Sequence, residues 1–530
     1  MSHELPTFST EPSLRLRDNP IILAQARRHL RRKELVGQAT VMGAGSILAI
    51  LFGLTVHEDG AWNGLRVLVL SIMALTLLFR GTNSAGAALQ ADRTSGILDF
   101  HRATPTSPAT DALGYLLGSC AREYFVVAML LPLLLISTLA GGAPLLPTLG
   151  ILGLILVYGW LYQLWAMLLA LFAGEKKRFI NQASLWVLLL HALAWPFYQL
   201  GLVALSYLTP IPLLSELVEH EVVPPEPFTM AQTVSLLGLE LPPLLFALMV
   251  LGVALYFVAR GTVRRLQRED MPLFSRTGAL TFFALAVLLV VGGAFGMVAN
   301  ASDWDARMDR LGGVMATHVM GSTALAVVLL ITLTPHRMEL ARATRRAQKQ
   351  GLRQAPWRQD GARVWPLVPI FGFLVVAGLL LAVPELSSAG LERLLEPFVW
   401  VVIPAPLILL AFMAGVTEYV RLGTRASARS TLLVIFVSCV LPLMVAGVLS
   451  SANQPDAALY VAALSPLLGF LGSAGVLGTA LAGEGSVKVG ELTPILLSQA
   501  VSVGATLWLY RNSNLSVPAS AGAPAAPASP

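Results

Sequence analysis

Residues 146–173, LPTLGILGLILVYGWLYQLWAMLLALFA, contain no charged side chain and decide the class of this protein. A helix of about 20 apolar residues crosses the roughly 30 Å hydrocarbon core of a bilayer. Similar runs recur along all 530 residues, of which 55% are hydrophobic and only 12% charged. Soluble domains carry about 25% charged residues. The sequence therefore predicts an all-α polytopic membrane protein.

Twelve apolar runs, bounded by charges or by Gly and Pro, predict membrane-spanning helices. They lie at 38–56, 64–80, 113–140, 146–173, 180–208, 236–259, 278–299, 313–334, 365–384, 397–417, 430–450 and 491–510. Two further stretches, 209–232 and 457–483, are only partly apolar, and each follows a fifth span. We expect both to dip into the membrane from the outer face without crossing it.

The distribution of positive charge predicts the orientation. With the N-terminus in the cytoplasm and twelve spans, most of the 36 lysines and arginines fall on cytoplasmic segments, where such residues are retained. The outer loops carry acidic residues instead. We therefore predict an N-in, C-in topology. We attribute the net charge of +6 to basic residues at the cytoplasmic edge of the membrane that contact lipid, and not to a surface that binds nucleic acid.

The two halves of the chain share one layout. Each begins with a basic segment, has a long cytoplasmic loop after its second span and has a short basic loop after its fourth. This predicts two tandem six-helix units related by a parallel repeat, a layout common in transporters. The predicted parts are a cytoplasmic N-terminus with a basic interfacial helix (1–37), the first unit (38–260, with a loop at 81–112), a linker (261–277), the second unit (278–510, with a loop at 335–364) and a disordered Ala/Pro-rich tail (511–530).

Motifs for catalysis, metals and cofactors are missing from the sequence. The chain has no G-x-x-x-x-G-K-[ST] phosphate-binding motif and no His pair at helical spacing. Cys120 and Cys439 are far apart in sequence, which argues against a disulfide framework. His191 and His318 fall in or beside spans, where an ionisable group is a functional candidate. A neutral histidine bonded to a helix carbonyl is the simpler interpretation of both. We expect no enzyme activity, no metal and no cofactor.

The first long loop contains ADRTSGILDFHRATPTSP at 91–108. Proline at 105 disfavours helix at the residue before it, whereas Ser107 and Pro108 fit an N-cap and a first helical position. We expect the helix that begins there to continue to Ala140. The apolar residues of ILDF, framed by charges, predict a short amphipathic element at the membrane edge. The alternative is a solvated hairpin loop that only joins two spans.

These residues resemble a known family. Residues 91–118, ADRTSGILDFHRATPTSPATDALGYLLG, are similar to the loop between the second and third spans of ABC-2-type transporter permeases. Residues 18–32, DNPIILAQARRHLRR, resemble the interfacial helix that opens such permeases, and the phrases LTP and LSP after the fifth spans resemble the one before their re-entrant outer helices. The loop at 335–364 lacks the Gly-apolar-acidic phrase, so whether the second half engages a partner in the same way stays open.

The resemblance implies the membrane subunit of an ABC exporter in the cell's inner membrane, driven by a separate ATP-binding subunit present in two copies. It implies a coupling region for that partner at Asp92, Arg93, Gly96, Leu98, Asp99 and Arg102, and an interfacial helix bearing Arg28, Arg31 and Arg32. It does not identify the substrate. Two other hypotheses stand beside it. One is an ion-coupled secondary transporter, which the lack of Asp or Glu in span centres disfavours. The other is a membrane scaffold that transports nothing.

Overall fold

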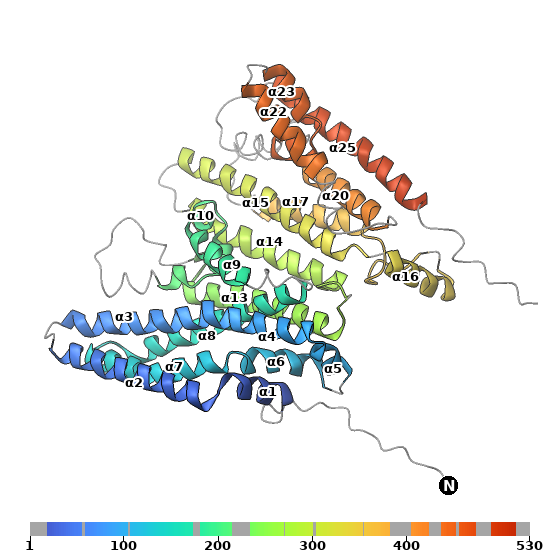
Figure 1. Cartoon of the computed structure of the whole chain (residues 1–530). Coiled ribbons are helices and arrows are strands. Elements are labelled where there is room, and N and C mark those ends of the chain that lie inside the picture. Colours follow the sequence, from blue (N-terminus) through green and yellow to red (C-terminus); the bar gives the residue numbers. More distant parts are fainter. Residues whose placement is uncertain are drawn as a thin grey trace, which may run out of the picture. The chain divides into compact units, whose positions relative to one another are not determined.

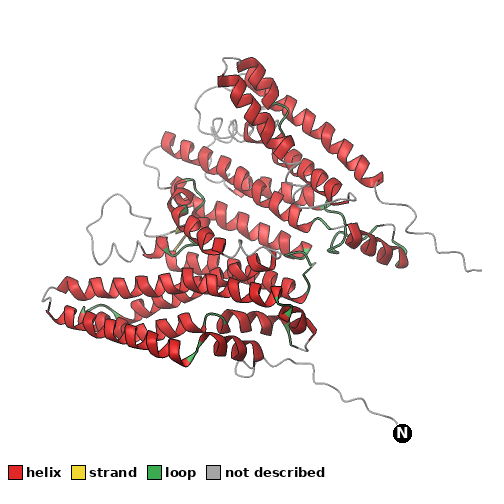
Figure 2. Cartoon of the chain, in the orientation of Figure 1, coloured by secondary structure: helices red, strands yellow, loops and turns green. Residues whose placement is uncertain are grey.

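The chain is helical almost throughout (Figure 2). The structure, a computed structural model, describes residues 19–515 except 56–58, 104–105, 173–180, 215–233, 270, 300–303, 336, 353, 382–403, 423–435, 452–454 and 473–488. The chain divides into two compact units. Unit 1 comprises Met1–Ala194, Tyr207–Leu217 and Leu248–Met271, and unit 2 comprises Trp195–Ser206, Val218–Ala247 and Pro272–Pro530. Their main boundary, Met271–Pro272, falls inside the predicted linker.

The prediction of an all-α, multi-pass membrane protein is confirmed. Within the described residues, eight helices are long and apolar enough to cross a membrane: Leu35–Thr55, Ala61–Thr94, Ala121–Ala140, Leu145–Phe172, Pro243–Gln267, Arg276–Ala294, Gly313–Leu333 and Leu492–Asn512. Three shorter apolar helices add Ala183–Ala192, Leu367–Leu379 and Phe436–Ala446. The count of twelve and the N-in, C-in orientation remain predictions.

Unit 1 is built on long helices that pack along one another (Figure 1). Its helices are α1 (Pro20–His29), α2 (Arg32–Thr55), α3 (Asp59–Leu75), α4 (Thr82–Thr94), α5 (Ile97–Ala103), α6 (Pro108–Gly118), α7 (Ala121–Ala140), α8 (Leu145–Phe172), α9 (Asn181–Ala192) and the part of α13 (Pro243–Gln267) from Leu248 onward. A π-helical turn, Thr76–Gly81, joins α3 to α4. The core between α3, α7 and α8 is aliphatic, with Met73, Leu77 and Leu134 fully buried.

The second and third spans differ from the prediction. The second continues as helix through α4 to Thr94, so much of the predicted loop 81–112 is helical. The predicted continuous helix from Pro108 to Ala140 is wrong, because α6 stops at Gly118 and α7 begins at Ala121. At the break, the Ser119 hydroxyl donates to the Tyr115 carbonyl and the Cys120 thiol donates to the Gly81 carbonyl at 3.3 Å. Such side-chain bonds to the backbone compete with regular helix.

The predicted fifth span, 180–208, is also interrupted. It consists of α9, α10 (Ala194–Gln199) and α11 (Val203–Ser206), in place of one continuous helix. Gly201 adopts φ +75° after α10, a conformation that favours glycine and ends the helix there. Of the two stretches expected to re-enter the membrane, most of 209–232 and the end of 457–483 lie outside the described residues.

Unit 2 contains a small hairpin and a second set of helices. The strands β1 (Val234–Leu236) and β2 (Leu239–Leu241) pair antiparallel, with Val234 opposite Leu241 and a turn at Leu237 and Gly238. The predicted sixth span therefore starts as hairpin at 236 and becomes helix only at Pro243. The helices are α14 (Arg276–Ala299), α15 (Trp304–Leu333), α16 (Arg337–Lys349), α17 (Leu367–Leu381), α20 (Ala405–Leu422), α22 (Leu441–Ser451), α23 (Pro455–Ala462) and α25 (Val489–Leu515), with a π-helical turn at Phe436–Val440 before α22.

Within each half, the helices of corresponding spans pack on one another in the same pairs. In unit 1, the helix of the second span (α3 and α4) packs on those of the third (α7) and fourth (α8), and α2 packs on α7. In unit 2, α15 packs on α17 and α20, and α14 packs on α17. The tandem repeat of two six-helix units remains a prediction.

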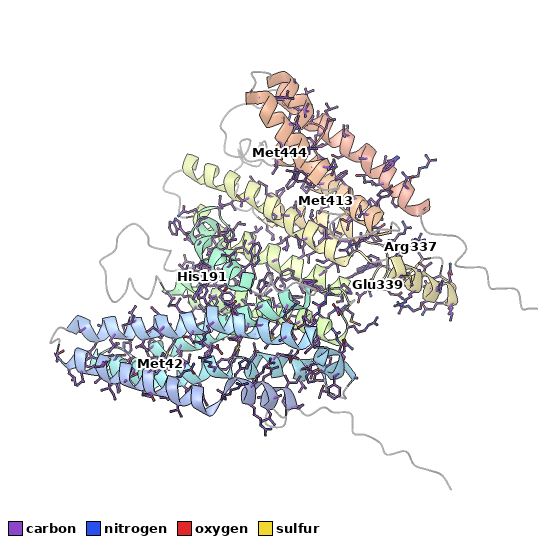
Figure 3. The ribbon with its side chains drawn as sticks, in the orientation of Figure 1. Met42, His191, Arg337, Glu339, Met413 and Met444 are labelled. Carbon is purple, nitrogen blue, oxygen red and sulfur yellow. The ribbon has the colours of Figure 1, made fainter. Side chains whose placement is uncertain are left out.

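Both span histidines bond to helix carbonyls. The Nδ1 of His191 on α9 (Figure 3) lies 2.8 Å from the Val187 carbonyl of its own helix. The Nε2 of His318 lies 3.1 Å from the Val375 carbonyl, and its Nδ1 lies 2.9 Å from the Ser322 hydroxyl. Both rings therefore contact a helix carbonyl, as the simpler interpretation expects. Their neutral form remains a prediction.

Candidate coupling region at one end of unit 1

Four helices of unit 1 meet at one end of the unit. In Figure 1, α1, α5 and α6 gather at the end of α4, away from the end at which α2 stops and α3 begins. We call α1, the last three turns of α4, the turn at residues 95–96, α5 and α6 the coupling region, after the role that the sequence resemblance implies. It contains the positions at which the sequence resembles the ABC-2-type loop and all nine candidate residues except Arg31 and Arg32, which follow α1.

The first turn of helix α1 is hydrogen-bonded to the first turn of α6. Asn19 caps α1 by accepting bonds from the amides of Ile21 and Ile22, while its own amide nitrogen donates to the Thr110 carbonyl at 2.7 Å. Ser107 caps α6 by accepting from the Thr110 amide at 3.1 Å, so the predicted helix start at Ser107 and Pro108 is confirmed. The side chain of Asn19 thus caps α1 and also bonds to Thr110, the residue whose amide is capped by Ser107 in α6.

Two glycines let the helices approach closely. A Cβ at Gly114 would lie 2.7 Å from the Cβ of Ile21, and one at Gly118 would lie 3.0 Å from the Cα of Ile22. Gly114 and Gly118 are one helical turn apart on α6, so they form a groove in which α1 rests. The GYLLG phrase therefore has a packing role.

Asp92 is the buried centre of the region. Its side chain is only 5% exposed, and its Oδ2 accepts from the Gln25 amide at 2.8 Å and from the Tyr115 hydroxyl at 2.9 Å. The guanidinium of Arg28 lies 3.7 Å from its Oδ1. A buried carboxylate needs such donors, because leaving it unpaired costs far more than the bonds return. Asp92 thus links α4, α1 and α6.

Arg93 binds the end of α8. It donates to the carbonyls of Ala170 and Leu171 at 3.0 and 3.1 Å, and it pairs with Glu269 just beyond α13. The last carbonyls of a helix have no partners within it and carry partial negative charge, which a guanidinium satisfies well.

Helix α5 turns back on α4 and is held by a second arginine. Gly96 adopts φ +77°, the left-handed conformation that the turn requires. Leu98 packs into the buried core of the unit. Arg102 donates to the Leu266 carbonyl at the end of α13 at 3.0 Å, and to Asp99 at 2.8 Å. The predicted short element is thus a helix, and its position at the membrane edge remains a prediction.

The outward face of α5 has a different chemistry. The side chain of Asp99 is 76% exposed, and Phe100 and Ile97 are 68% and 44% exposed. Asp92 and Leu98 are buried, whereas Arg93 and Arg102 direct their bonds to the ends of α8 and α13. The outward face of α5, meaning Ile97, Asp99 and Phe100, is therefore the part that a partner can reach.

Another carboxyl, that of Asp111, lies in the first turn of α6. Burial raises the pKa of Asp111 above its ordinary value of 3.8, and this outweighs the opposing effects of the Thr106 hydrogen bond and the His101 charge. Its Oδ1 has no hydrogen-bond partner among the described atoms. The carboxyl of Asp111 therefore favours the protonated form more in the folded protein than in the unfolded chain.

The structure brings together most of the candidate residues. Asp92, Arg93, Gly96, Leu98, Asp99, Arg102 and Arg28 lie in one connected region, and Arg31 is exposed just after α1. Arg32 begins α2, and its side chain lies outside the described residues. Sequence reasoning missed Asn19, Gln25, Tyr115 and Glu269. Asn before Pro20 and the G-x-x-x-G spacing were the available signals, whereas Gln25, Tyr115 and Glu269 gave none.

The candidate region offers no metal centre. Among the described residues, no group of three His, Cys, Asp or Glu side chains is placed to hold a metal ion.

In comparisons with known proteins, no protein family, curated protein or solved structure matches this chain. The geometry and the sequence resemblance therefore carry the functional argument.

Proposed function

We propose that this chain is the permease subunit of an ABC-2-type transporter in the inner membrane, exporting its substrate with ATP hydrolysed by a separate subunit. The observation that carries the proposal is the way α5 is held. Its Arg102 bonds to the end of α13, Arg93 just before it on α4 bonds to the end of α8, and its outward face presents Ile97, Asp99 and Phe100. An exposed apolar pair beside a carboxylate is the kind of patch on which a partner docks.

The contacts give α5 a means of passing force to the membrane helices. Displacing α5 strains the bond from Arg102 to α13, and displacing α4 strains the bonds from Arg93 to α8 and the buried bonds of Asp92. These bonds are charge-assisted and partly or wholly shielded from water, so they are stiffer than exposed ion pairs. Motion imposed by an ATPase therefore moves the ends of several spans together.

The stoichiometry follows from the tandem layout. If each half supplies one six-helix unit, a single chain forms the translocation path and two ATPase subunits bind below it. A mass measurement of the purified complex that gives two copies of this chain would contradict this part of the proposal.

The test is affinity purification of the full chain from its own host membranes, with mass spectrometry of whatever accompanies it. We expect an ATP-binding-cassette subunit with the wild type and at least a tenfold loss of it with Ile97→Asp/Phe100→Asp, since removing two apolar contacts at an interface costs about 1.4 kcal/mol or more. Ile97→Val/Phe100→Leu keeps this patch apolar, serves as the matched control and should retain the subunit. No ATPase with the wild type, together with transport driven by an ion gradient, would favour the secondary transporter instead.

A further inference from the structure

Helix α16 presents two faces of opposite character. Its sequence, RMELARATRRAQK, contains five cationic residues and one carboxylate, Glu339. Leu340, Ala343 and Ala347 are buried against the rest of unit 2. A Cβ at Gly361 would lie 2.9 Å from the Cβ of Ala343, so the chain after α16 packs closely on this apolar face.

The other face is a continuous basic surface. Arg342, Arg345, Arg346 and Lys349 are exposed and recur at spacings of three and four residues, which places them along one side of the helix. In the part of the chain that the structure describes, none of these four forms an ion pair. We call these four residues the basic face.

The one carboxylate of α16 is engaged elsewhere. Burial lowers the pKa of Arg421, and the charge of Glu339 opposes that shift, so Glu339 acts on Arg421 of α20. Figure 3 marks Glu339 and Arg337 on the first turn of α16, before the basic face begins. The basic face therefore keeps its positive charge.

The helix is held close to the end of a span. It begins at Arg337, four residues after Leu333 ends the apolar helix Gly313–Leu333. Arg421 donates to the Thr334 carbonyl between them. The segment that packs on α16 is held by Arg276, which donates to the carbonyls of Trp357, Ala362 and Arg363.

We propose that the basic face binds anionic phospholipid headgroups of the adjacent leaflet. Basic clusters immediately beside the cytoplasmic end of a span are attracted to anionic lipid, and long Lys and Arg side chains reach the headgroups from a helix that packs on protein. A phosphate surface complements four unpaired cations, whereas the exposed face of α5 carries a carboxylate and apolar groups. The exposed faces of α5 and α16 thus differ in chemistry, and this second assignment does not depend on the first.

The test uses the full chain purified in mild detergent without any other protein, titrated with phosphatidylglycerol or phosphatidylcholine and followed by native mass spectrometry. Each basic residue near a lipid surface changes affinity about fivefold. Arg342→Gln/Arg345→Gln/Arg346→Gln should therefore weaken phosphatidylglycerol binding by on the order of a hundredfold. The matched triple Arg→Lys variant keeps the charge and should bind within about threefold of wild type, because the headgroup requires charge more than a fixed fork of donors.

Equal binding of the two lipids by the wild type, or unchanged phosphatidylglycerol binding in the triple Gln variant, would overturn the proposal. If that variant instead loses an acidic protein on purification from host membranes while its lipid binding stays intact, the basic face is a protein-docking surface. Failure of this test leaves the ATPase proposal untouched, since no ATPase takes part.

Discussion

At the scale of single residues, the carboxylates of the coupling region differ in their surroundings. Asp92 has two hydrogen-bond donors and a nearby guanidinium, Asp99 is exposed beside Arg102, and Asp111 is buried with one oxygen unpaired. Sequence alone distinguished none of them. Asp92 is set apart by its donors Gln25 of α1 and Tyr115 of α6, which lie 67 and 23 positions from it along the chain.

Replacing Asp92 should loosen the junction of α1, α4 and α6. Asp92→Asn places an amide where two donors converge, so we expect a loss of about 2 kcal/mol of stability, the usual range for bonds to a charged group. Tyr115→Phe removes one of those bonds and should cost about 1 kcal/mol. Thermal unfolding in detergent measures both. Equal melting temperatures for Asp92→Asn and wild type would contradict the buried bonding described for this site.

Asp111 should make stability depend on pH in the opposite sense to a salt-bridged carboxylate. Because its folded pKa is raised above 3.8, it favours the fold below that pH and costs stability as pH rises through the folded value. Asp111→Asn should therefore raise the melting temperature at neutral pH, and the gain should shrink below about pH 4. A gain that is constant from pH 7 to pH 3.5 would mean that ionisation is not its cause.

At the scale of helices, local signals were reliable and long-range ones were not. Ser107 and Pro108 predicted the start of α6 because capping is decided by a few adjacent residues. The break at Ser119 and Cys120 was missed because it depends on the Gly81 carbonyl, which another helix supplies. The same holds for Arg93, whose partners lie 77 and 78 positions along the chain.

The crossing of α1 over α6 should be sensitive to any side chain at Gly114. Gly114→Val introduces atoms where Ile21 and Asn19 already lie, and we expect a loss of about 1–3 kcal/mol. Gly153→Ala on α8 has open space around it and should be neutral or mildly stabilising. Tryptic cleavage after Arg27 and Arg28, compared with thermal unfolding, would show whether α1 has been released. If both variants behave as wild type does, α1 is not held by this groove.

At the scale of the whole molecule, the composition was enough to predict a multi-pass membrane protein. The orientation of the chain in the membrane is predicted separately, from the uneven distribution of Lys and Arg between its loops. The two halves also diverge in their long loops, at 81–112 and 335–364. The outward face of α5 carries Asp99 and Phe100, whereas α16 carries the basic face. One layout therefore supports two different surfaces.

Cysteine labelling should establish the orientation directly. Cys120 and Cys439 are buried, so the wild type should label little and provides its own background. With N-in, C-in topology, cysteines at positions 219 and 305 should react with an impermeant reagent in intact cells, and those at positions 176 and 346 only after lysis. Labelling of position 346 from outside would reverse the orientation of α16 and its span.

The π-helical turn at Thr76–Gly81 has a consequence for changes in chain length. Removing one residue from a packed α-helix rotates everything beyond it by about 100°, which at α4 would carry Asp92 away from Tyr115. A π turn already holds one residue more than an α turn, so it can close to a regular turn and leave both flanks where they are. The loss would be local: the Leu77 carbonyl faces Gln163 and the Gly81 carbonyl faces Cys120. Homologues one residue shorter should therefore have their gap at 76–81, and a deletion of Leu78 should be far milder than a deletion of Ala88.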